Sequence, residues 1–123
     1  MDELQERENE VVLVYATFPG LAEAEEISCK LLGENLIACA NIFSGMISIY
    51  RWNNMLERDT EVVVIFKTDE RLSQALVSRI EQLHSYDVPA ILVLPVSGGN
   101  QGYIDWVTRM TGGDGTISGE VKG

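Results

Sequence analysis

Residues 36–68 read LIACANIFSGMISIYRWNNMLERDTEVVVIFKT, and this stretch decides the fold. An apolar run fills residues 36–52, which is far longer than the usual strand of about five or six residues. Gly45 is expected to interrupt the run as a bulge or a bend. The asparagines at 53–54 predict a turn because asparagine tolerates left-handed backbone angles, and residues 60–68 return as an antiparallel strand. The sequence therefore predicts one long hairpin.

Helices and further strands flank the hairpin in a regular order. The strands are expected at residues 11–17 and 91–96, and the helices at residues 21–36 and 72–84, with a short helix at 103–110. This order of strand, helix, strand, strand, helix, strand is the split βαβ arrangement. The predicted fold class is α+β: a ferredoxin-like βαββαβ sandwich with a long central hairpin and an extra C-terminal helix. Its two main helices are expected on one face of an antiparallel sheet.

A chain of 123 residues fits a single domain, which we place at residues 11–111. Residues 1–10 are expected to form a flexible acidic arm and residues 112–123 a flexible glycine-rich tail, because neither has enough apolar side chains to pack. The hairpin offers more apolar surface than one such domain covers. Bare strand edges invite pairing with another chain, so self-association is predicted.

The net charge of −10 opposes binding to nucleic acids and to anionic membranes. The N-terminal residues lack the pattern of a secretory signal, and no segment has the roughly 20 apolar residues of a membrane helix. The sequence therefore predicts a cytoplasmic protein with no nucleic-acid or membrane partner. Cys29 and Cys39 are too far apart for a CxxC pair, and burial as free thiols is favoured over binding of a soft metal such as Cu(I).

A few positions carry candidate chemistry. His84, the only histidine, ends a predicted helix, where it either interacts with the helix dipole or serves in binding or proton transfer. Arg51 and Trp52 lie at the predicted hairpin tip, and an interface anchor is favoured over a ligand-stacking platform. Glu61 and Lys67 bound an apolar strand, either as solvated strand ends or as a clamp for an anionic ligand. Because no nucleophile is paired with a base, an enzyme is not favoured.

Five short blocks, in this order and spacing, resemble the signature blocks of the CutA divalent-cation-tolerance family. They are ACANI at 38–42, SIYRW at 48–52, Glu61 leading to Lys67-Thr68, HSYDVP at 84–89 and YIDW at 103–106. The resemblance implies a ferredoxin-like fold, a tight homotrimer whose hairpins pack between subunits, and tolerance of divalent metals with copper binding in some members. The architecture is also similar to that of the PII signalling trimers, which bind small ligands in clefts between subunits.

The same resemblance implies where a site lies. The residues expected near the intersubunit cleft are Cys39, Asn41, Tyr50, Glu61, Lys67, Tyr86 and Trp106. Those expected at the trimer interface are Tyr50, Arg51 and Trp52, and His84 is the candidate metal ligand. The chain departs from copper-binding members at Ala16 and Leu83, where they have a cysteine and a second histidine. It departs from the family at Ala90, where glutamate is usual.

Two functional hypotheses follow. The leading one is a non-enzymatic homotrimer that takes part in tolerance of, or response to, divalent metal ions, with copper or another divalent metal held weakly. The alternative is a PII-like signalling trimer that takes a small anionic ligand in the intersubunit cleft, using Lys67, Tyr86 and Trp106.

Overall fold

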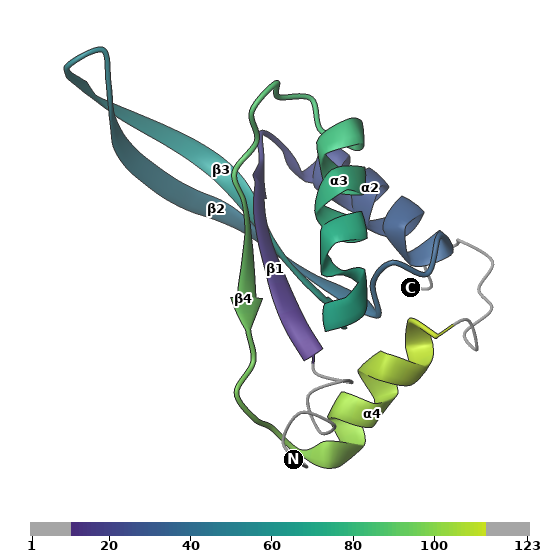
Figure 1. Cartoon of the computed structure of the whole chain (residues 1–123). Coiled ribbons are helices and arrows are strands. Elements are labelled where there is room, and N and C mark those ends of the chain that lie inside the picture. The colour runs from purple at the N-terminus through teal and green to yellow at the C-terminus, as the bar shows by residue number, and fades with distance from the viewer. Residues whose placement is uncertain (1–10, 113–123) are drawn as a thin grey trace.

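The computed structural model describes residues 11–112, which form one sheet with helices packed against it (Figure 1). The strands are β1 (Val11–Phe18), β2 (Cys39–Trp52), β3 (Met55–Asp69) and β4 (Ile91–Pro95). The helices are α2 (Leu21–Gly33), α3 (Ser73–Leu83) and α4 (Gln101–Met110), with a 3-10 helix, η2 (Glu70–Leu72), ahead of α3. This order confirms the predicted βαββαβ arrangement with an additional C-terminal helix. The predicted acidic arm, and all of the predicted tail after Gly112, lie outside the described residues.

The sheet has the strand order β2-β3-β1-β4, and each neighbouring pair is antiparallel. α2 and α3 both lie on one face of the sheet, as Figure 1 shows. Alternate residues of the two central strands are buried under these helices, namely Val14, Ala16 and Phe18 of β1 and Val62, Val64 and Phe66 of β3. Because side chains alternate between faces, the intervening residues lie on the opposite face, which α2 and α3 leave uncovered.

β2 and β3 form the predicted long hairpin. Asn53 and Asn54 make its turn with φ angles of 52° and 64°, left-handed values that suit a two-residue hairpin connection. The register shifts between Phe43 and Met46, and Gly45 has a φ of 77°, which confirms the predicted bulge.

The return strand begins earlier than the sequence indicates. β3 starts at Met55 rather than at residue 60, and Met55 pairs with Trp52 directly across the turn. Residues 57–59 are charged and show no apolar alternation, but they are compatible with a strand whose two faces are both exposed.

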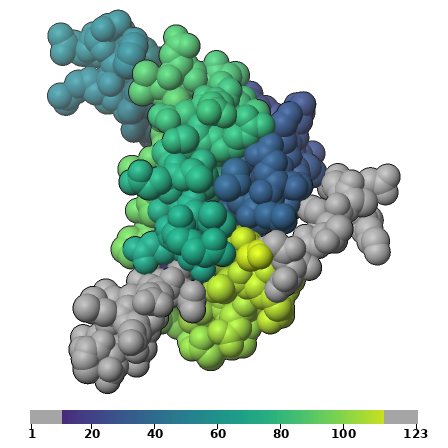
Figure 2. Space-filling model, turned by 45° about the vertical axis from the view of Figure 1, so that its right-hand side comes forward, coloured from purple at the N-terminus to yellow at the C-terminus, as the bar shows by residue number. Residues whose placement is uncertain are grey.

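Residues 46–61, which we call the hairpin arm, project beyond the body of the molecule (Figure 1, Figure 2). Every residue from 51 to 60 is exposed, and Trp52 and Leu56 keep 64% and 79% of their surface in contact with solvent. Trp52 pairs with Met55, which is 66% exposed, so two large apolar side chains are exposed side by side there. Such a pair marks a surface for protein–protein contact. In the described chain, the outer edges of β2 and β4 are unpaired as well.

α2 ends at Gly33 rather than at residue 36 because the chain reverses there. Asn35 takes a left-handed φ of 60°, and the Leu36 N–H donates to the Leu31 carbonyl at 3.1 Å. This is the pattern of a Schellman end, in which a left-handed residue stops the helix.

α4 lies at the end of the sheet opposite the hairpin arm (Figure 1). Its Val107 is fully buried and packs with Val11 and Ala38. Trp106 is half-buried against the same cluster. Within residues 11–112, every helix is too short or too polar to cross a membrane.

Candidate functional site

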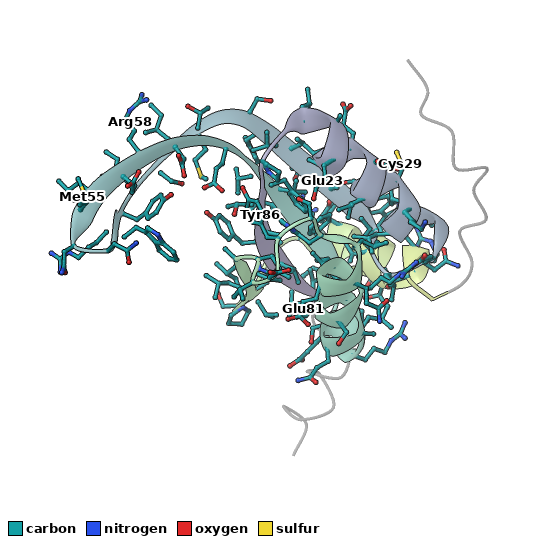
Figure 3. The ribbon with its side chains drawn as sticks, turned by 90° about the horizontal axis from the view of Figure 1, so that it is seen from above. Glu23, Cys29, Met55, Arg58, Glu81 and Tyr86 are labelled. Carbon is teal, nitrogen blue, oxygen red and sulfur yellow. The ribbon has the colours of Figure 1, made fainter. Side chains whose placement is uncertain are left out.

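A cleft of about 580 Å³ opens between the hairpin arm and the segment that follows α3. Its lining residues are Thr17 of β1, Tyr50, Trp52, Glu57, Asp59 and Glu61 of the hairpin arm, and Tyr86, Val88 and Ala90 after α3. Figure 3 shows Tyr86 on the concave side of the curved hairpin. We call this site the acidic cleft, because the described residues that line it include three carboxylates and neither lysine nor arginine.

The register of the hairpin places the acidic side chains on one face. Glu57, Asp59 and Glu61 alternate along β3, so they share the face that lies away from α2 and α3. Across the strand pair, Tyr50 lies opposite Glu57 and Ser48 lies opposite Asp59. The Ser48 hydroxyl donates to Glu61 Oε1 at 2.8 Å, and the Tyr50 hydroxyl donates to Asp59 Oδ2. These hydrogen bonds fix the orientation of two of the three carboxylates.

Two tyrosines respond to the negative charge of the cleft. The hydrogen bond to Asp59 raises the pKa of Tyr50 to about 12, and the charges of Glu57 and Glu61 act in the same direction. Partial burial raises the pKa of Tyr86, and the charges of Glu61 and Asp59 again add to the shift. The cleft therefore disfavours a further negative charge and favours a positive one.

His84, the predicted metal ligand, is buried behind the cleft and does not line it. Its side chain is 0% exposed, and its ring stacks on Phe18 with 4.6 Å between the ring centres. Nδ1 accepts the backbone N–H of Tyr86 at 3.1 Å, so in this arrangement Nδ1 carries no proton. Nε2 then donates to the Thr17 carbonyl at 2.7 Å. Both ring nitrogens are committed to hydrogen bonds that hold the Tyr86 segment against the end of β1.

Glu23 of α2 completes this anchoring. Its carboxylate accepts the Ser85 backbone N–H at 3.0 Å and the Ser85 hydroxyl at 2.9 Å. One of its oxygens also lies 3.8 Å from His84 Nδ1. Because the hydrogen bonds of His84 are those of a neutral imidazole, we treat this approach as a contact and not as an ion pair. The segment that places Tyr86 in the cleft is thus held by hydrogen bonds with both His84 and Glu23.

The other predicted cleft residues form a second group near α4. Lys67 lies opposite Cys39 across β2 and β3, and Asn41 Nδ2 donates to Cys39 Sγ at 3.7 Å. Lys67 Nζ donates to the Tyr103 hydroxyl at 3.2 Å and lies 5.2 Å from the centre of the Tyr103 ring. Trp106 stacks on Tyr103 with 5.5 Å between the ring centres.

One copy of the chain therefore brings together only part of the predicted set. Tyr50, Glu61 and Tyr86 share the acidic cleft, whereas the residues near α4 are Cys39, Asn41, Lys67 and Trp106. The sequence reasoning missed Glu57 and Asp59, although acidic residues at alternate positions of a strand mark a common face. Ala90 does line the cleft, at the position where the family resemblance implies that a carboxylate has been lost.

The cysteines differ from expectation. Cys29 and Cys39 are free thiols, but both are half-buried and not fully buried as predicted. Figure 3 shows Cys29 on α2, on the side away from the hairpin arm. Within residues 11–112, no three histidine, cysteine or acidic side chains come close enough together to hold a metal ion.

Comparison with known proteins adds independent information. Residues 12–110 match the family model for the CutA1 divalent ion tolerance protein. The chain is 36% identical over 100 residues to "Protein CutA 1, chloroplastic" of Oryza sativa subsp. japonica, which is 81% of this chain and 56% of the rice protein. The chain thus spans little more than half the length of that relative. It is 38% identical over 96 residues to the divalent-cation tolerance protein CutA of Yersinia pestis (strain Pestoides F), covering 78% of this chain and 81% of the relative.

A solved structure agrees with these sequence matches. The crystal structure of divalent ion tolerance protein CutA1 from Ehrlichia chaffeensis matches with a TM-score of 0.81 and 39% identity, covering 84% of this chain and 96% of the other. The predicted ferredoxin-like fold class is confirmed by this likeness. The rice relative is named chloroplastic, so family membership alone does not fix the compartment. The matched region includes the hairpin arm, the acidic cleft, His84 and nearly all of the described chain, and we conclude that this chain belongs to the CutA1 divalent ion tolerance protein family.

Proposed function

We propose that this chain works as a non-enzymatic homotrimer in tolerance of, or response to, divalent metal ions. Membership of the family supports the link to divalent ions. The hairpin arm carries the proposal of self-assembly, because large apolar side chains such as Trp52 and Leu56 are exposed on strands that extend past the body of the chain. Tyr50, Arg51 and Trp52 are the proposed interface contacts.

A ring of copies accounts for the separation of the two groups of predicted cleft residues. One group lies beside the hairpin arm, and the other lies near α4 at the opposite end of the sheet (Figure 1). An interface that joins the arm of one copy to the far end of the next is heterologous, and such interfaces close into rings where the rotation fits. Lys67 of one copy would then approach the acidic cleft of its neighbour, where three carboxylates outnumber it.

Copper or another divalent ion is proposed to be held weakly, with His84 as the candidate ligand. Because Nδ1 accepts the Tyr86 N–H, a metal ion at this nitrogen has to displace that hydrogen bond. Binding is therefore coupled to release of the segment that carries Tyr86 into the acidic cleft. The cost of breaking buried hydrogen bonds lowers the affinity of such a site.

Sedimentation velocity at micromolar protein concentrations tests the assembly. The expected result is one species with three times the 13.6 kDa mass of the chain. A stable single copy under these conditions contradicts the proposed homotrimer.

Nitrogen NMR of the imidazole tests the metal contact, and its signals are unambiguous because the chain has one histidine. Zn²⁺ is expected to shift the Nδ1 signal and the Tyr86 amide signal together, and Cu²⁺ to give saturable heat in calorimetry. His84→Ala is the comparison variant, with circular dichroism to check its fold, because the substitution also removes two buried hydrogen bonds. The proposal of metal binding is wrong if neither ion gives saturable heat or shifts these NMR signals.

The anionic-ligand alternative depends on a second copy, because Lys67 lies outside the acidic cleft of its own chain. We rank it below the first proposal, since three carboxylates repel an anion. A thermal-shift screen of nucleotides and carboxylic acids tests it. A stabilising compound whose effect is lost in Lys67→Ala is the result that favours this alternative.

A further inference from the structure

We propose that Cys29 is a site of reversible thiol modification, at which a short aliphatic thiol with a positive charge is held as a mixed disulfide. The aliphatic part of this adduct lies in a cavity between α2 and β2. The site goes beyond the proposed role in divalent-metal tolerance and does not depend on it. Three features carry the proposal: the cavity, a buried hydroxyl without a partner, and the charges beside the thiol.

The cavity has a volume of about 590 Å³ and lies between α2 and the first part of β2. Ala40 and Ile42 form its wall on β2. They pair with Phe66 and Val64, which are buried beneath the helices, so this wall is on the helix-covered face of the sheet. Leu32 adds an apolar wall on α2. The cavity is therefore built outside the hairpin arm and outside α4, the two surfaces that the proposed assembly joins.

Ser28 gives an independent sign that the cavity takes a ligand. It lines the cavity, and only 4% of its surface is exposed. Within the described residues 11–112, its Oγ has no hydrogen-bond partner. The hydroxyl of Thr111, at the end of α4, donates instead to the Val107 carbonyl at 3.0 Å. Because an unpaired buried hydroxyl destabilises the fold, a bound molecule that offers a hydrogen bond to Ser28 gains affinity.

The thiol and two carboxylates define the chemistry of the ligand. Cys29 lines the same cavity as a free, half-buried thiol. Glu25 and Glu26, one turn earlier on α2, line it as well and are exposed. Two carboxylates attract a cationic group and repel an anionic one. The site thus matches a short alkyl chain with sulfur at one end and an ammonium group at the other, whose N–H groups can donate to Ser28 Oγ.

The modification is a thiol–disulfide exchange with a symmetric aliphatic disulfide. Cys29 loses its proton to solvent, and the thiolate attacks one sulfur of the disulfide. A new S–S bond forms at Cys29 while the S–S bond of the reagent breaks, and the second half leaves with the electron pair and takes up a proton. Cys29 is oxidised and half of the reagent is reduced, so no further oxidant is needed. Excess thiol reverses the reaction.

Equilibration of the full chain with three disulfides of similar length tests the proposal, each in a buffer with its own thiol at physiological ionic strength. Cystamine ends in ammonium groups, hydroxyethyl disulfide in hydroxyls and dithiodipropionate in carboxylates. Peptide mass spectrometry measures the equilibrium constant at Cys29, divided by that of the same chain unfolded in urea, which removes differences between the thiols themselves. This ratio is expected to be roughly five-fold higher for cystamine than for hydroxyethyl disulfide, and lowest for dithiodipropionate.

Substitutions locate the adduct. Ala22→Leu fills the mouth of the cavity from an exposed position and is expected to lower the ratio for all three reagents roughly three-fold. Ser28→Ala is expected to lower it roughly three-fold for cystamine. Glu25→Gln combined with Glu26→Gln should remove the preference for cystamine. Glu81→Gln is the matched control, because Glu81 is an exposed carboxylate on α3, and it should leave the preference unchanged (Figure 3).

Cys39 provides a comparison in the same sample. It is also a free, half-buried thiol, but it lies opposite Lys67 across β2 and β3, so it should not favour cystamine. Several results overturn the proposal: a Cys29 that ranks the reagents alike in the folded and unfolded chain, a Cys39 with the same preference for cystamine, or Ala22→Leu and Ser28→Ala without effect. An equal loss of preference in Glu81→Gln and in the double variant also overturns it.

Discussion

The two halves of the β2–β3 hairpin have the same backbone pairing and opposite surroundings. In the half near the body, the β3 residues Val62, Val64 and Phe66 are buried beneath α2 and α3. In the hairpin arm, residues 51–60 are exposed on both faces. Strand pairing continues through both halves, with the bulge at Gly45 between them.

This difference shows that backbone pairing of two strands does not require that either face of the pair be buried. Backbone hydrogen bonds extend the ladder as far as the turn, but a two-stranded ribbon without a covered face is marginally stable in water. The buried half is stabilised by contacts within one copy, whereas the apolar residues of the hairpin arm need contacts from outside the chain. Substitutions in the two halves should therefore have different effects, on folding in one case and on association in the other.

The largest expected effect on folding is in the buried half. Phe66 is fully buried and meets Phe18 edge to face, with 6.4 Å between the ring centres. Phe66→Ala is expected to lower the free energy of unfolding by about 3–5 kcal/mol. Phe43→Ala makes the same change at a residue of β2 that is 54% exposed, and should cost less than about half as much. Urea denaturation followed by circular dichroism measures both, and equal losses would contradict the comparison.

The next effect concerns the hairpin arm and is on association. Trp52→Asp places a charge in the proposed interface and is expected to weaken self-association by roughly 30-fold, the scale of an interface hot spot. Helical and strand content should be retained, because residue 52 contributes to no buried cluster. Gln74→Asp adds the same charge to an exposed site on α3 and serves as the control. Sedimentation equilibrium gives the association constants, and the same constant for both variants would remove the hairpin arm from the interface.

The boundary between the halves gives a smaller effect. Gly45 has a φ of 77° and open space around the position of a Cβ atom, so Gly45→Ala adds backbone strain without a clash. The expected loss of stability is about 1–2 kcal/mol. Gly33→Ala is the matched control, because it also meets open space but has an ordinary φ at the end of α2. Its stability should be unchanged or slightly higher, and thermal melts that rank the two variants the other way would count against the bulge.

The smallest expected effect is a pH dependence of stability, from an ion pair beside the helices that cover the sheet. Arg79 of α3 donates to both Glu34 oxygens, at 2.9 and 2.8 Å, and its hydrogen bonds lower the pKa of Glu34 from 4.5. The Glu34 carboxylate therefore binds a proton more readily in the unfolded chain than in the folded one. Its contribution to the free energy of unfolding is present at neutral pH and is lost as the pH falls through the lowered pKa. Arg79→Met should lower the urea midpoint slightly at neutral pH and leave it unchanged in acid. A difference that persists in acid would mean that the side chain acts through packing.

The sequence predicted the order of elements because that order depends on local signals. Alternation of apolar residues, the asparagines at the turn and Gly45 each act over a few residues. The first residues of β3 were missed because polar residues 57–59 carry no such signal when both faces of a strand are exposed. The strand propensity of a residue reflects how well it fits a half-buried sheet surface, and this part of β3 has no buried face.

The candidate site was only partly predictable for a related reason. Tyr50, Glu61 and Tyr86 were expected together from the family resemblance, and one chain does bring them into a common cleft. The position of His84 depends on the Thr17 carbonyl, which is far away in sequence, so spacing alone cannot show that both ring nitrogens are occupied. Contacts of this kind appear only once strands and helices are packed.

The strand order has a consequence for how the chain is made. β1 is synthesised before the other described strands, yet it pairs with β3 and with β4, so the cross-strand neighbour of Val14 on β4, Val93, is made much later. Contacts between residues so distant in sequence slow folding, and an early strand without partners is exposed to aggregation during synthesis. We expect the nascent chain to acquire native protease resistance only after β4 has emerged.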